Sequence, residues 1–154
     1  MASQLRVDKI LPVDGAPTGG GGGVIQVVHS STGTLMESST IDTDYDTNLS
    51  ATITPKFNTS KILITVAQSC SVRSTVAGTY AMNLSLVRTP SGGSSVIIID
   101  GDNGASAMGN FSGRANTPTS YNYISSMVPL NILDEPATTS AITYKTTALL
   151  TTAN

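Results

Sequence analysis

Two stretches with alternating apolar residues decide the fold class: KILITVAQS, residues 61–69, and YAMNLSLVR, residues 80–88. The apolar residues at every second position are Ile62, Ile64 and Val66 in the first stretch, and Met82, Leu84 and Leu86 in the second. Alternation of this kind indicates an extended strand with one face in a core. No window of comparable length has the spacing of an amphipathic helix.

Further strand-type runs lie on both sides of these two stretches. They cover residues 24–29, 49–54, 95–99, 120–133 and 142–150, and the run 120–133 is either one long strand or two strands broken near Pro129. Turn-type residues separate them at 55–58, 89–93, 100–104 and 134–136. Residues 91–100 read as a hairpin arm, because Gly92 and Gly93 can adopt the positive φ of tight turns. Short strands separated by turns predict an all-β fold, an antiparallel β-sandwich of jelly-roll-like type.

The composition argues against several classes of function. Of the 154 residues only 12% are charged, the net charge is −2, and the basic residues are scattered. Without a basic patch the chain is not expected to bind nucleic acid. It has no apolar run near the length of a membrane span. No secretory signal is evident, so we expect synthesis in a cytoplasm.

The N-terminal region differs in character from the rest of the chain. Residues 1–18 contain apolar and charged residues, residues 19–23 are the linker Gly19, Gly20, Gly21, Gly22 and Gly23, and residues 24–154 form the predicted sandwich. The glycines are not a phosphate loop, which would need a helix after them. Residues 1–18 are therefore interpreted as an arm that docks on a partner. Its anchoring side chains are Leu5, Val7, Ile10 and Leu11, and the alternation of Leu5 and Val7 suits strand addition to a partner's sheet.

No residue pattern supports catalysis, a metal site or a cofactor. The one histidine, His29, excludes a two-histidine metal site, and the one cysteine, Cys70, is expected to be a buried, inert thiol. Asp42, Asp44 and Asp46 begin like a calcium loop, but the turn glycine and the closing glutamate are missing. Residues 100–104 also lack the ligand pattern of a calcium-binding loop. Both acidic clusters are interpreted as solvated turns.

Residues 101–119 are rich in Gly, Asn and Ser and predict a long exposed loop, where binding sites of β proteins often lie. Tyr121 and Tyr123 share one side of the following strand. They belong either to the core or a subunit interface, or to an outward contact. The candidate contacts with a receptor are Asn110, Phe111, Arg114, Tyr121 and Tyr123.

Three phrases of the sequence resemble virion structural proteins of marine tailed phages, of the cyanophage type. They are SQLRVDKILPVDGAPTGGGGG with VIQVV after it, residues 3–28, ITPKFNTSKILITV, residues 53–66, and LDEPATTSAITYK, residues 133–145. Members of this group are tail-fibre-like or other structural proteins. The resemblance implies a virion location after synthesis in the host cytoplasm, and a homotrimer. It also implies other virion proteins of the capsid, portal-neck or tail as partners.

Two hypotheses from different classes follow. The first is a phage virion structural protein, a short fibre or a capsid or tail decoration, anchored by residues 1–18. The alternative is a receptor-binding module of a tail fibre that recognises a polysaccharide of the host surface through residues 101–119 and the tyrosines, although the chain has no Trp for stacking. An enzyme such as a depolymerase is disfavoured, because the acidic residues fall mainly in turns.

Overall fold

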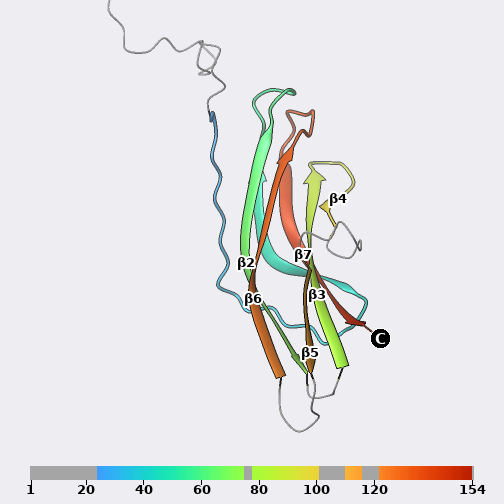
Figure 1. The fold of residues 1–154 in the computed structure, drawn as a ribbon. Coiled ribbons are helices and arrows are strands. Elements are labelled where there is room, and N and C mark those ends of the chain that lie inside the picture. The colour runs from blue at the N-terminus through green and yellow to red at the C-terminus, as the bar shows by residue number, and fades with distance from the viewer. Residues whose placement is uncertain (1–23, 75–77, 101–109, 116–121, 154) are drawn as a thin grey trace, which may run out of the picture.

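The computed structural model describes residues 24–74, 78–100, 110–115 and 122–153 of the chain (Figure 1). This part of the chain contains strands and no helix, hence no helix long and apolar enough to cross a membrane. The strands are β1 (Asp44–Ile53), β2 (Ile62–Ser74), β3 (Gly78–Pro90), β4 (Val96–Ile99), β5 (Asn110–Ala115), β6 (Asn122–Asp134) and β7 (Ile142–Ala153). The all-β fold expected from the sequence is confirmed.

The strands form two antiparallel sheets that pack against each other. The first has the order β1-β7-β3-β4, with β5 also pairing with β3, and the second consists of β2 and β6. The pairing is nested, because β1 pairs with β7, β2 with β6, and β3 with β5. A long hairpin rolled into two layers gives such pairing, which is the principle of a jelly roll. The predicted β-sandwich is thus the observed architecture.

The core lies between the two sheets. Side chains of β3 and β7 meet side chains of β2 and β6, and the buried set is Cys70, Val72, Met82, Leu84, Leu86, Ile99, Val128, Leu130, Ile142, Tyr144 and Ala148. Leu84, Leu130 and Ile142 have no exposed surface. Burying a side chain of this size contributes about 1.5–3 kcal/mol. The alternation at Ile62, Ile64 and Val66 also points to this core, although these three are only partly buried.

The observed strands extend most of the predicted ones. The stretch 61–69 became β2, which continues to Ser74, and 80–88 became β3. Residues 120–133 hold one strand, β6, rather than two. Pro129 is tolerated within it because β6 has a partner on one side only, where an edge strand can leave a missing N–H unpaired.

A tight turn joins β3 to β4, as the glycines predict. Gly92 has a φ of 72°, and the Gly93 N–H donates to the Pro90 carbonyl oxygen at 3.0 Å. The Thr89 and Ser95 hydroxyls form a hydrogen bond of 2.8 Å across the base of this hairpin.

Two expectations about elements are wrong. Residues 24–29 form no strand, and the described chain is without strand structure from Val24 to Thr40. A strand needs a hydrogen-bonded neighbouring strand as well as suitable side chains. Within the described chain, residues 24–29 have no such neighbour. Residues 101–119 are not one long loop either, because Asn110–Ala115 form β5 and pair with β3. The remainder of that stretch, 101–109 and 116–119, lies outside the described residues.

Candidate functional site

One cluster of ionised and polar side chains is buried between the sheets. Arg88 of β3 donates from Nη1 to both carboxylate oxygens of Asp134, at 2.7 and 3.0 Å. The Tyr144 hydroxyl of β7 donates to Asp134 Oδ2 at 2.6 Å. Asp134 belongs to β6 of the opposite sheet, so the cluster connects the two layers. Burial, and then the hydrogen bond to Asp134, raise the pKa of Tyr144. The phenol therefore stays a proton donor at neutral pH, and the cluster is a cross-sheet clasp.

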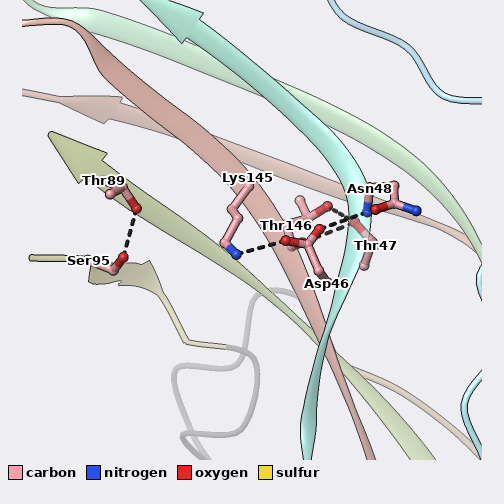
Figure 2. A network of polar contacts seen from close by, with 7 residues as sticks. All are labelled: Asp46, Thr47, Asn48, Thr89, Ser95, Lys145 and Thr146. Carbon is pink, nitrogen blue, oxygen red and sulfur yellow. Dashed lines mark hydrogen bonds and ion pairs between the residues drawn. The ribbon is translucent and has the colours of Figure 1, made fainter. Parts of the chain in front are cut away.

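A second polar cluster surrounds an irregularity in β1, shown in Figure 2. The register between β1 and β7 shifts between Asp46 and Ser50, and Asn48 there has a φ of 60°. Asn tolerates this left-handed conformation better than most residues. The Asp46 carboxylate accepts from the Asn48 N–H at 2.8 Å and pairs with Lys145 Nζ at 2.8 Å. These two contacts lower the pKa of Asp46, the Lys145 contact having the larger effect.

A buried hydroxyl lies beside this irregularity. The side chain of Thr47 is buried and is hydrogen-bonded to the Thr146 hydroxyl and carbonyl oxygen. Thr146 in turn donates to Gln68 Oε1 of β2 at 2.8 Å. Gln68 lies in the second sheet, so this chain of hydrogen bonds is another polar connection between the layers. The Thr47 and Thr146 hydroxyls both have hydrogen-bond partners, and satisfied buried groups of this kind stabilise a unique packing.

The residues considered above for catalysis or metal binding are Cys70, His29 and the acidic residues that include Asp46. Cys70 is buried, and burial raises the pKa of its thiol, so the thiolate needed for reactivity is disfavoured. His29 is exposed in the segment without strands. The carboxylate of Asp46 is occupied by Lys145 and Asn48, as described above. Within the described residues no group of three or more His, Cys, Asp or Glu side chains is placed to hold a metal ion.

The predicted receptor contacts are divided between the two sheets. Asn110, Phe111 and Arg114 belong to β5 and stand opposite Asn83, Met82 and Thr79 of β3. Tyr123 belongs to β6 and stands opposite Arg73 of β2. Tyr121 lies outside the described residues. These residues thus come from strand positions of both layers and not from one loop.

The predicted anchor and linker also lie outside the described residues. They are Leu5, Val7, Ile10, Leu11 and the glycines of 19–23. The described chain begins directly after the linker, at Val24.

An uncharged sheet surface was not recognised from the sequence. The outward side of the β2–β6 sheet presents exposed side chains in cross-strand pairs. We call its central part the uncharged face, and this consists of Leu63, Thr65, Ala67, Ser69 and Ser71 of β2, and Ser125, Met127, Pro129, Asn131 and Leu133 of β6. The next outward position of β2 is the exposed Arg73. Its largest apolar side chains are well exposed, with 71% for Leu63, 60% for Met127 and 54% for Leu133. The alternation that revealed the buried side of 61–69 also defined this opposite side.

The second unexpected feature is the leading segment, residues 24–40. It is drawn in blue in Figure 1 and runs outside the sandwich without forming a strand. All its residues from 24 to 37 are exposed. They include Val24 at 83%, Val27 at 81% and Leu35 at 77% exposure. Its contact with the sandwich includes a hydrogen bond of 2.8 Å from Asn48 Nδ2 to Met36 Sδ. Together with the uncharged face, this segment carries most of the exposed large apolar side chains of the described chain.

Comparison with known proteins adds no relative. A scan against protein-family models finds no family that matches the chain, and searches of curated proteins and of solved structures find no significant match.

Proposed function

We propose that this chain is a phage virion structural protein, a short fibre or a decoration of the capsid or tail, held on the particle by residues 1–18. The observation that carries the proposal is the leading segment. Strands β1 to β7 build the sandwich and its core without residues 24–40, so the chain before β1 is available for attachment. The phrases shared with virion proteins of marine tailed phages support the same function.

The described surface supports an assembling role. The uncharged face and the leading segment leave large apolar side chains in water, and cores of subunit interfaces are depleted in charged residues. A homotrimer is the proposed assembly, as the resemblance implies. Its mass in solution should be three times the 15.8 kDa of one chain.

Attachment is tested by removing residues 1–23 in phage particles that assemble with this chain. We expect the shortened protein to keep the far-UV circular dichroism and melting temperature of the full chain, because no core residue of the sandwich is removed. It should be lost from purified particles. A matched control replaces Gly19–Gly23 by five serines, which preserves the linker's length and should preserve incorporation. Normal incorporation of the shortened protein would contradict the proposal.

A further inference from the structure

The leading segment contains a strand-type sequence without a sheet. Val24, Ile25, Val27 and Val28 are β-branched residues, which favour pleated, half-buried positions. They are exposed to 83%, 45%, 81% and 41%, and their backbone is in no ladder of the described chain. Burial of one such side chain contributes about 1.5–3 kcal/mol, so association that covers this run is favoured.

The sandwich also contains a sheet with a vacant edge. The β2–β6 sheet has only two strands within the described chain, so each of them has a side without a partner strand. On β6 that side is interrupted by Pro129, which has no N–H to donate. On β2 the residues from Ile62 to Val72 contain neither Pro nor a charged residue. Proteins usually protect such long regular edges, because an unpaired edge is a template for another strand.

The other edges of the sandwich are poorer acceptors. The outer strand β1 carries the irregularity at Asp46 to Ser50 and two acidic side chains, Asp44 and Asp46. The outer strand β4 has only 4 residues. Residues 62–72 of β2 therefore offer a longer regular edge than β1 or β4.

We propose that Val24–Val28 of one copy adds as a strand to the free edge of β2 in a second copy of this chain. The inference deepens the proposed function, and it rests on the homo-oligomer proposed there. The added strand lies beside the uncharged face of the second copy. The copy that supplies the strand also covers part of that face. Passing one segment to the next copy around a ring closes a cyclic oligomer in which every segment and every β2 edge is used.

Length, charge and area agree with a second copy as the occupant. Residues 24–40 can span ~55 Å at ~3.3 Å per residue, and β2 measures ~43 Å on the same scale. No charged residue lies between Val24 and Met36, so no repulsion opposes docking on the uncharged β2 edge. The β2–β6 face alone offers roughly 400 Å², about half of the ~800 Å² that each partner buries in a standard interface. The added strand Val24–Val28 contributes further area.

The first test compares solution masses of full-length variants by light scattering. The wild-type chain should have a multiple of the 15.8 kDa chain mass. The double variant Val24→Asp/Val27→Asp should raise the dissociation constant at least ~100-fold and give the monomer mass. Leu35→Asp is the matched control, because Leu35 is as exposed and belongs to the same segment but lies outside the proposed strand; it should leave the mass unchanged. A wild-type monomer, or a double variant with the wild-type mass, would overturn the inference.

The second test identifies whose β2 edge is covered. Chains carrying Val27→Cys with Thr65→Cys, or Val27→Cys with Ser69→Cys, are oxidised briefly, with the buried native Cys70 as an unreactive background. The expected product is a disulfide between chains in at least one of the two variants. A disulfide within one chain would show that the segment covers its own β2 and would overturn the inference, and so would the absence of any cross-link in both variants.

The two proposals can fail separately. If the Val24→Asp/Val27→Asp variant is monomeric and is still incorporated through residues 1–18, while the chain without residues 1–23 is lost from particles, both are supported. If the wild-type chain is a monomer in solution and is still incorporated through residues 1–18, strand exchange is overturned and the virion function stands.

Discussion

At the scale of single residues, Asp134 is the side chain on which the clasp with Arg88 and Tyr144 depends. It accepts three hydrogen bonds, two from Arg88 and one from Tyr144, and its side chain is only 10% exposed. Its neighbour Glu135 pairs with Lys61 at the surface, where both side chains are more than half exposed. Adjacent residues thus make a buried and an exposed ion pair, which allows a direct comparison of the two environments.

We predict that Asp134→Ala lowers the free energy of unfolding by about 3 kcal/mol, because it leaves the Arg88 guanidinium without its counter-charge in a largely buried place. Glu135→Ala is the matched control and should change stability by less than about 1 kcal/mol. Urea denaturation of both variants at neutral pH measures the difference. Equal, small effects would show that the clasp adds nothing beyond a surface pair.

The raised pKa of Tyr144 predicts a loss of stability in alkaline solution. The folded state holds the phenolic proton more strongly than the unfolded state, so the stabilisation is complete below the unfolded pKa and is lost as the pH rises above it. Between about pH 9 and about pH 11.5, wild-type protein should therefore lose more stability than Tyr144→Phe. Denaturation midpoints measured across this range test the difference. If both proteins lost the same stability as the pH rises, ionisation of Tyr144 would not be the cause of the loss.

At the scale of elements, the turn between β3 and β4 depends on one glycine. Gly92 has a φ of 72°, which residues with a side chain adopt with strain, whereas Gly93 has no positive φ. A methyl group added at Gly92 meets nothing within 4 Å, so its effect would come from the backbone alone.

Gly92→Ala should therefore destabilise the protein by about 1 kcal/mol. Gly93→Ala is the control, because its added Cβ would lie 3.4 Å from the Pro90 Cβ, close to an ordinary contact. We expect a change within about 0.5 kcal/mol for this variant. Thermal unfolding of the two proteins distinguishes them, and a larger loss at Gly93 would show that crowding rather than φ controls the turn.

The strand-type run at 24–29 shows what an element requires beyond its side chains. Its β-branched residues match those of 95–99, which did form the strand β4. The difference is the neighbour: a turn places 95–99 beside β3, whereas nothing in the described chain lies in register with 24–29. Propensity therefore identified a segment able to pair, and topology decided that it does not pair within the described chain.

At the scale of the whole molecule, the scarcity of charge bears on how copies would associate. The proposed contact joins residues 62–72 of β2, which include no charged residue, and an uncharged run; among the ion pairs of the described residues, the surface pair Lys61–Glu135 borders this edge and the other two lie away from it. We therefore predict that the oligomer mass is unchanged between about 0.1 M and about 1 M NaCl. Sedimentation at the two salt concentrations measures this. Dissociation in high salt would indicate an electrostatic interface and a different contact surface.

Local sequence patterns were enough to predict the fold class and most strand positions, because alternation and turn residues act over a few neighbouring positions. The buried sides of 61–69 and 80–88, the turn at Gly92 and the inert surroundings of Cys70 all belong to this local information. These patterns did not predict the nested pairing, the clasp of Arg88, Asp134 and Tyr144, or the strand at Asn110–Ala115 inside an expected loop. Each depends on residues far apart in the chain, and their proximity is set by how the whole hairpin rolls into two layers. Within the described residues, the same long-range pairing leaves Val24–Val28 without a sheet and β2 with a free edge, which local sequence patterns do not reveal.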